Sequence, residues 1–322
     1  MNKNSSNMMF FSSLMFSFTL SLTTNSMIIM WMMIEMSTLS FIPLMMNKKM
    51  LNSESIMKFF IMQSLSSSML IFSMILMFMK MKFNNLLIMS LIMKMGGVPF
   101  QNWLLSMIEG MSYYSMVIMF TFMKIPPFII INEMNEKLTF IIILSVMFAP
   151  VLMINQIQIK KILAYSSIFN MSNMLMLASN NKLWITFLSL YTLLLMMNVN
   201  EMKKNKIFHI NQMLINNKSK VKNSIIWLSM LSMGGMPPLM GFLNKLMVIK
   251  TLIEKKELIL LMMMIFSSSM IMFMYMKLCV SSILMSMSMS KYKILILSFN
   301  QSTLIIMNLL TLPISIMIKV FN

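Results

Sequence analysis

Long apolar stretches are the feature that most limits what this chain can fold into. Along all 322 residues, stretches of about 17 to 25 residues with few charges recur, and each is long enough to cross a bilayer as a helix. The chain is 58% hydrophobic and only 11% charged, whereas a soluble domain is about a quarter charged. No stretch alternates with the period of a barrel strand. The sequence therefore predicts an all-α polytopic membrane protein.

Eleven spans are predicted within a single transmembrane domain that covers residues 1–322, and a lysine-rich loop, 200–223, is expected to be a flexible surface connection. Outside the spans, fourteen lysines fall on the N-terminal side and eight on the other, so the positive-inside rule places the N-terminus on the inner side. The predicted spans are 9–24, 27–46, 59–79, 86–105, 115–131, 139–155, 162–180, 183–199, 224–249, 258–285 and 294–318.

Amino-acid usage indicates where the gene resides. The chain has 54 Met, no Arg and no Asp, and residues with GC-rich codons are nearly absent. This pattern is typical of an AT-rich gene read with a mitochondrial code, so the expected location is the mitochondrial inner membrane with the N-terminus in the matrix. Met is a pliable apolar residue, and the methionines are interpreted as packing rather than as ligands.

Metal and redox sites are not expected in this chain. Cys279 is the single cysteine and His209 the single histidine, and a zinc, haem or iron–sulfur site needs several converging ligands. The net charge of +18 comes from lysines that lie mostly in loops. In a membrane protein this favours lipid headgroups as partners, and not nucleic acid.

Five charged residues lie inside predicted spans: Glu35, Lys94, Lys124, Lys245 and Lys277. A lone ammonium group at the bilayer centre costs at least ~3 kcal/mol, and pairing, hydration or loss of the proton lowers that cost. Glu35 and Lys94 lie at the same depth, roughly 12 Å into their spans, so an ion pair between them is possible. Lys277, and to a lesser degree Lys245, are also compatible with side chains that extend to the membrane surface.

Helix breakers recur beside these lysines. The pentad Met-Gly-Gly-x-Pro occurs at 95–99 and again at 233–237, and Pro126-Pro127 follow Lys124. The two pentads lie in spans that run in opposite directions, which is typical of transporters with inverted halves, here about 86–199 and 224–318. A break frees backbone carbonyls that need water or a neighbour. The pattern predicts hydrated pockets in which lysines take and release protons, with Glu35 modulating Lys94. Glu109 is either a structural cap or a proton entry residue.

Five segments carry a resemblance to a known family. They resemble the subunit 2 family of mitochondrial respiratory complex I (NADH:ubiquinone oxidoreductase), one of the antiporter-like proton-channel families, and they keep the family's order from about residue 31 to 250. The segments are "WMMIEMSTLSFIPLM", "KMGGVPFQNWLLSMIEG", "FMKIPPFII", "KKILAYSSIFNMSNML" and "LSMGGMPPLMGFLNK".

The resemblance implies a membrane-arm subunit that translocates protons, coupled to electron transfer from NADH to ubiquinone in other subunits. FMN and iron–sulfur clusters are expected there and no cofactor here. The expected partners are other membrane-arm subunits and lipids such as cardiolipin. It implies that Glu35 modulates Lys94, that Lys124 is the central lysine and that Lys245 lies on the exit path.

The chain departs from the family at two positions. The family often has His where this chain has Gln101 and Asn170, and neither substitute titrates near neutrality. A relay through these positions would need water. Two other functions stay open: a free-standing cation/proton antiporter, and a structural membrane-arm subunit that conducts nothing.

Overall fold

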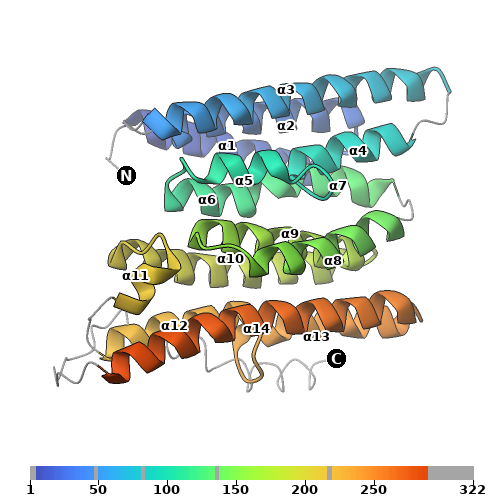
Figure 1. Ribbon diagram of the computed structural model, residues 1–322. Helices are drawn as coiled ribbons and strands as arrows, with labels where there is room; N and C mark the ends of the chain where they lie inside the picture. The colour runs from blue at the N-terminus through green and yellow to red at the C-terminus, as the bar shows by residue number, and fades with distance from the viewer. Residues whose placement is uncertain (1–4, 47–49, 81–83, 135–137, 216–219, 289–322) are drawn as a thin grey trace. The chain divides into compact units, whose positions relative to one another are not determined.

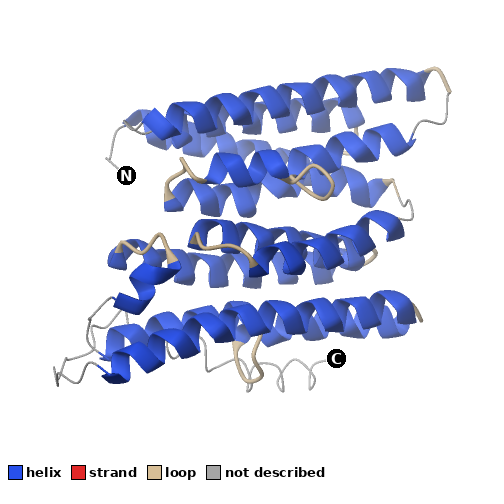
Figure 2. Ribbon diagram, in the orientation of Figure 1, coloured by secondary structure: helices blue, strands red, loops and turns tan. Residues whose placement is uncertain are grey.

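The structure is a computed structural model that describes residues 5–46, 50–80, 84–134, 138–215 and 220–288. Within these ranges every regular element is a helix, as Figure 2 shows. Helices occupy all the predicted spans up to residue 285, and the eleventh, 294–318, lies outside the described residues. The expected all-helical class is therefore confirmed for the described part of the chain.

The chain divides into two compact units, residues 1–145 and 146–322, with the boundary inside α8 (Thr139–Ile154). Unit 1 contains α1 (Ser5–Thr23), α2 (Met27–Met45), α3 (Met50–Phe78), α4 (Asn84–Met95), α5 (Asn102–Ile108), α6 (Tyr113–Phe120), the 3-10 helix η1 (Phe122–Lys124) and α7 (Ile125–Glu133) (Figure 1). Unit 2 contains α9 (Ile159–Leu177), α10 (Asn181–Asn205), α11 (Ile210–Ile215), α12 (Lys220–Gly234), α13 (Met240–Glu254) and α14 (Leu258–Ser288).

In the described part of the chain, five helical segments are long and apolar enough to cross a membrane. They are Met27–Met45, Met50–Phe78, Tyr113–Glu133, Asn181–Asn205 and Leu258–Leu284. The third is not a single α-helix, because it is interrupted between α6 and α7. Two of the predicted spans are divided in a similar way, into α4 with α5 and into α12 with α13.

Serines are frequent in these apolar helices, and their hydroxyl groups bond within the helix. In α3, Ser66 Oγ donates to the carbonyl of Gln63 at 2.8 Å and Ser73 Oγ to that of Leu70 at 2.7 Å. In α9, Ser172 Oγ donates to Phe169 O at 2.6 Å. Because each hydroxyl proton has a partner three residues earlier, serine needs no water there and is tolerated in an apolar environment.

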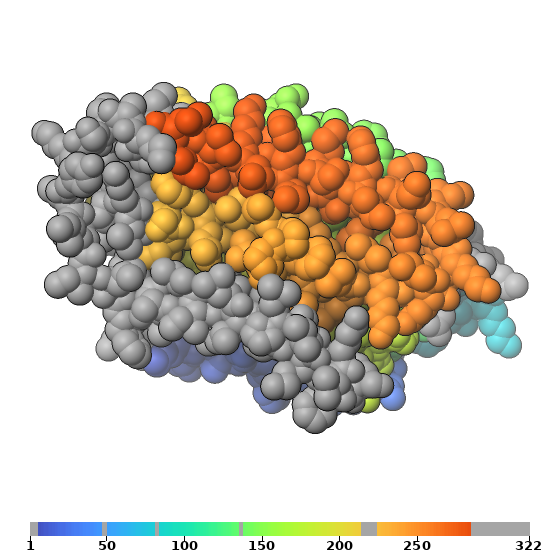
Figure 3. Space-filling model, turned by 90° about the horizontal axis from the view of Figure 1, so that it is seen from below, coloured from blue at the N-terminus to red at the C-terminus, as the bar shows by residue number. Residues whose placement is uncertain are grey.

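Within unit 2, α9 is the most enclosed helix and α14 has an apolar outer side. Most residues of α9 are buried, and α10 and α13 pack against it. The side chains of α13 and α14 form a continuous face in Figure 3. Large apolar residues of α14 such as Met262 and Phe273 are exposed. Such a face requires a lipid or protein neighbour, as expected for a membrane helix.

The segment 200–223, predicted to be a flexible loop, is helical at residues 200–205, 210–215 and 220–223. There α10 continues to Asn205, and α11 follows at Ile210. Between them, residues 208 and 210 exchange backbone hydrogen bonds with residues 159 and 157 across an antiparallel bridge between Gln158 and His209. The lysines and asparagines made this segment resemble a polar loop, whereas Glu201 and Met202 are buried on the inner face of α10. His209 is exposed, as predicted.

Candidate functional site

Two helices, α4 and α12, end with the same hydrogen-bond pattern. In each, the N–H of a glycine bonds the carbonyl three residues earlier, and the next N–H bonds the carbonyl five residues earlier. The glycines are Gly96 (φ +71°) and Gly235 (φ +72°), and the left-handed conformation at this position of the Schellman motif favours glycine. By this geometry, Gly235 is the counterpart of Gly96. Aligning the letters of the two pentads would instead make Gly234, one residue earlier, the counterpart of Gly96.

Each helix end leaves a carbonyl that a side chain from elsewhere satisfies. At the end of α4, Gln63 Nε2 of α3 donates to Lys94 O at 3.2 Å. At the end of α12, Lys245 Nζ donates to Gly234 O at 2.6 Å. The usual partner of Gly234 O would be the N–H four residues later, but that residue is Pro238. The breaks are therefore stable features with their own caps.

Lys94 forms an ion pair with Glu35 of α2. Lys94 Nζ lies 2.7 Å from Glu35 Oε1, and the side chains are 1% and 29% exposed. The ion pair that the equal depth of Glu35 and Lys94 in their spans made possible is therefore present. A buried cation of this kind depends on its partner, because removing either member of a buried pair leaves an uncompensated charge.

Lys124 lies at a second interruption in unit 1. It ends η1, is 3% exposed, and its Nζ is 5.9 Å from the centroid of the Phe120 ring. Pro126 and Pro127 begin α7, where proline is accommodated because the first N–H groups of a helix have no intrahelical partner. The prediction of a buried lysine beside a broken helix is confirmed here.

Lys245 lies beside a small polar cavity in unit 2. Its Nζ donates to Gly234 O at 2.6 Å and to Ser268 O at 3.2 Å. An ammonium group has three donors, so a third remains. The cavity has a volume of about 20 Å³, enough for a water molecule. Its lining includes Lys245, Asn170, Asn173, Asn244, Ser166, Tyr191, Phe169, Leu194, Met233, Gly241 and Ile271.

The remaining predicted residues have separate positions. Asn170 lines the Lys245 cavity. Gln101 is buried at the start of α5, and its Oε1 has no hydrogen-bond partner among the described residues. Glu109 follows α5 and is exposed, as is Lys277 on α14. In the described ranges, no three His, Cys, Asp or Glu side chains gather into a group that could hold a metal ion.

Sequence reasoning missed one buried acid, Glu201 of α10. Its side chain is 2% exposed and its Oε1 accepts a hydrogen bond from Lys204 Nζ at 3.0 Å. The sequence analysis assigned this residue to a loop. A usable signal was present, since buried positions of α10 continue with helical spacing from Tyr191 through Leu194 and Asn198 to Glu201.

Comparison with known proteins assigns the family. The transmembrane family described as NADH:quinone oxidoreductase/Mrp antiporter matches residues 24–86 and 79–271. The chain belongs to this family. Glu35, Lys94, Lys124 and Lys245 all fall inside the matched region.

Individual members show how far the similarity extends. NADH-ubiquinone oxidoreductase chain 2 of Aedes aegypti is 34% identical over 173 residues, which are 52% of this chain and 47% of that protein. The matched region is thus about half the length of that relative. A chain of respiratory complex I from Thermus thermophilus superposes with a TM-score of 0.75 at 18% identity, covering 88% of this chain and 71% of that chain. A chain of an archaeal membrane-bound sulfane sulfur reductase gives 0.79 at 16% identity, covering 97% and 73%. These two superpositions concern the fold alone.

Proposed function

We propose that the chain is the subunit 2 type of membrane-arm subunit in a mitochondrial respiratory complex I, and that it translocates protons across the inner membrane. The observation that carries the proposal is the ion pair between Lys94 and Glu35 at the end of a broken helix, with the lysine side chain 1% exposed. Ionisable groups inside a membrane bundle are costly to keep, and they mark ion and proton pathways.

The chemistry at Lys94 follows from its partner. While Glu35 is ionised and 2.7 Å away, its negative charge stabilises the ammonium form. When the carboxylate is neutralised or moves away, the ammonium is isolated in a low-dielectric interior. An N–H bond then breaks, and the proton forms an O–H bond with a water molecule, leaving a neutral amine. Return of the negative charge favours proton uptake by that amine.

Lys124 and Lys245 extend the same chemistry. Lys124 is buried beside a second helix interruption, and Lys245 adjoins a cavity with room for water. In this proposal the residues carry protons, while electron transfer from NADH to ubiquinone, with FMN and iron–sulfur clusters, takes place in other subunits. The further parts of the proposal are a single antiporter-like domain with inverted halves, an N-terminus in the matrix, and membrane-arm subunits and cardiolipin as neighbours.

The test is the variant Lys124→Met in the intact complex, purified and reconstituted into lipid vesicles. NADH oxidation and vesicle acidification are measured together to give protons moved per electron. We expect Lys124→Met to lose most of the proton transport that depends on this chain. The matched control is Lys277→Met, which removes an exposed lysine from α14 and should leave the ratio unchanged. Full coupled proton transport in Lys124→Met would instead establish a structural subunit that conducts nothing.

A further inference from the structure

Helix α10 carries a buried polar line that the proposed function does not use. Tyr191, Asn198 and Glu201 are separated by seven and three residues, so they share one face of the helix. They are 3%, 0% and 2% exposed. At 1.5 Å per residue the line is roughly 15 Å long. Tyr191 lines the Lys245 cavity, which places one end of the line at that lysine.

Helix α12 binds the middle of this line by hydrogen bonds and reaches the cavity lining by a close contact. Asn198 Nδ2 donates to Ser229 O at 2.8 Å, and Ser232 Oγ donates to the same oxygen at 2.7 Å. Ser232 O in turn contacts Gly241 so closely that a Cβ there would occupy the same place. Gly241 lines the cavity, so the hydrogen-bonded groups of Ser232, Ser229 and Asn198 begin directly behind the cavity lining.

The other end of the line reaches the surface. Glu201 Oε1 accepts a hydrogen bond from Lys204 Nζ at 3.0 Å, and the Lys204 side chain is 53% exposed. The buried carboxylate therefore lies directly beneath an exposed ammonium group. The α10 helix has 25 residues, a length of about 37 Å, so its end extends beyond a hydrocarbon core about 30 Å thick.

Three amide oxygens along this route have no hydrogen-bond partner among the described residues. They are Oδ1 of Asn173, Asn198 and Asn244. Asn173 and Asn244 line the cavity beside Lys245, and Asn198 lies midway along the route. Buried polar atoms are nearly always bonded to protein or water, so each of these oxygens is available to accept a hydrogen bond from a water molecule.

We propose that the residues Ser232, Ser229, Asn198 and Glu201 form a proton path between the Lys245 cavity and the surface at the C-terminal end of α10. This inference rests on the proposed function. Lysine counting places the C-terminal end of α10 on the matrix side, so the path takes up protons. The Glu201 carboxylate accepts a proton from surface water and passes it to water bound at Asn198. The neutral Lys245 amine then forms an N–H bond with a proton from cavity water, and Glu201 regains its charge. Water is the only co-reactant, and one proton enters for each that leaves.

The test uses Glu201→Gln and Asn198→Leu in the intact reconstituted complex, with protons moved per electron as the measurement. Glu201→Gln keeps the shape of the side chain but removes the group that exchanges a proton. Asn198→Leu keeps a similar volume but removes the water-binding amide. Each variant should lower the proton share carried by this chain by at least about tenfold, the effect expected for loss of a positioned proton carrier. If Glu201→Gln prevents assembly, Asn198→Leu decides the question.

The controls separate a proton path from a merely structural ion pair and from failure of the wider proposal. Lys204→Met breaks the same ion pair but leaves the Glu201 carboxyl group, so it should retain proton transport. Equal losses in Lys204→Met and Glu201→Gln would overturn the path in favour of a structural pair. Full transport in either path variant, together with loss in Lys124→Met, would overturn the path alone. Full transport in Lys124→Met as well would overturn the proposed function itself.

Discussion

Glu35 and Lys94 are unequally buried although they form one ion pair. The lysine side chain is 1% exposed and the carboxylate 29%. The carboxylate is thus the partner whose environment a neighbouring subunit or lipid can change, and the lysine is the partner that responds. An opposite charge this close alters a proton equilibrium by at least about tenfold, which corresponds to roughly 1.4 kcal/mol.

The variant Glu35→Gln tests this relationship. The amide keeps the size and a hydrogen-bonding oxygen but removes the negative charge, so Lys94 should lose its modulation while the helices still pack. We expect NADH-coupled proton transport to fall roughly tenfold or more, with normal amounts of assembled complex on a native gel. Loss of the complex from the membrane would contradict a tuning role and assign Glu35 to assembly. The control Glu54→Gln changes another acid of unit 1.

At the scale of the helices, the sequence predicted where the helices are interrupted but not the backbone conformation at each interruption. The glycines and prolines beside Lys94, Lys124 and Lys245 identified all three breaks, because these residues cannot continue the hydrogen-bond ladder. The letters of the two pentads align Gly96 with Gly234, whereas the left-handed conformation and the hydrogen bonds make Gly235 the counterpart of Gly96. A residue's φ depends on where its helix ends, and identical letters do not determine that.

The register can be tested with two adjacent alanine variants. A Cβ at Gly235 would lie 2.5 Å from Lys245 Cε, and the φ of +72° is unfavourable for alanine. At Gly234 the nearest atom would be Tyr275 Cβ at 3.3 Å. Gly235→Ala should therefore displace Lys245 and lower proton transport several-fold, while Gly234→Ala should change it by less than about twofold. The reverse order would support the register given by the letters.

A second prediction at this scale concerns the cap of α4. Gln63 Nε2 donates to Lys94 O, and Gln63 is 6% exposed. Gln63→Leu would leave a buried carbonyl without its partner, at a cost of about 1–3 kcal/mol. We expect a lower midpoint of thermal unfolding for the purified complex. The control is Gln156→Leu, since Gln156 lies just after α8 and its Nε2 donates at 3.4 Å to Leu152 O, four residues earlier in the chain. Equal midpoints for the two variants would show that the cap is dispensable.

At the scale of the whole molecule, composition predicted the class and concealed one functional candidate. Apolar stretches were enough to predict the helices, because a segment that spans a membrane must form all its backbone hydrogen bonds internally. The end of α10 was misassigned because its lysines and asparagines resemble a loop. Glu201 is buried on α10, and α10 packs against α12, which lies later in the sequence. The pairing of Glu35 with Lys94 was foreseen as possible from depth, but only the packed helices bring the two groups together.

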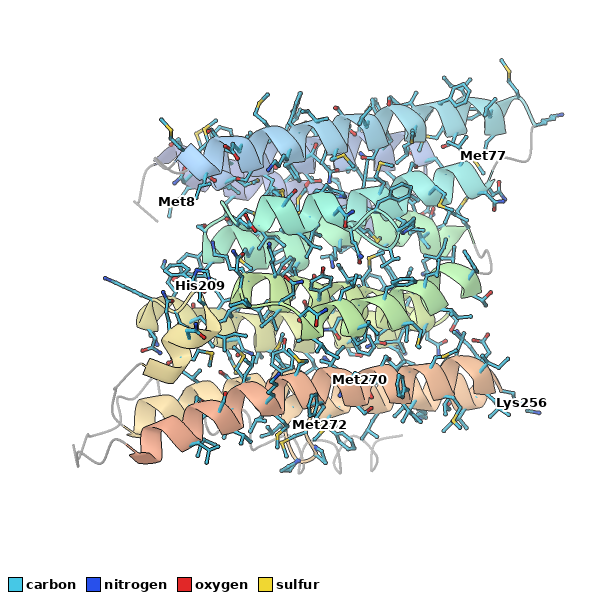
Figure 4. All side chains as sticks on the ribbon, viewed as in Figure 1. Met8, Met77, His209, Lys256, Met270 and Met272 are labelled. Carbon is cyan, nitrogen blue, oxygen red and sulfur yellow. The ribbon has the colours of Figure 1, made fainter. Side chains whose placement is uncertain are left out.

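Topology is the remaining whole-molecule prediction, and unit 2 provides two positions that test it. His209 and Lys256 lie at opposite ends of the unit 2 helices in Figure 4, and both are exposed. Lysine counting places His209 on the matrix side and Lys256 on the outer side. The native thiol of Cys279 is 2% exposed and interacts with Trp227 O at 3.6 Å, so it should not react with a membrane-impermeant maleimide.

We therefore expect His209→Cys and Lys256→Cys to behave differently in mitochondria whose outer membrane has been removed. Lys256→Cys should be labelled directly, because a thiol on the outer side meets the reagent. His209→Cys should be labelled only after detergent opens the inner membrane. The measurement is the mass shift of this chain on a denaturing gel, and the unsubstituted chain is the control. Labelling of His209→Cys alone would reverse the orientation, and labelling of both without detergent would mean that the chain does not cross the membrane between them.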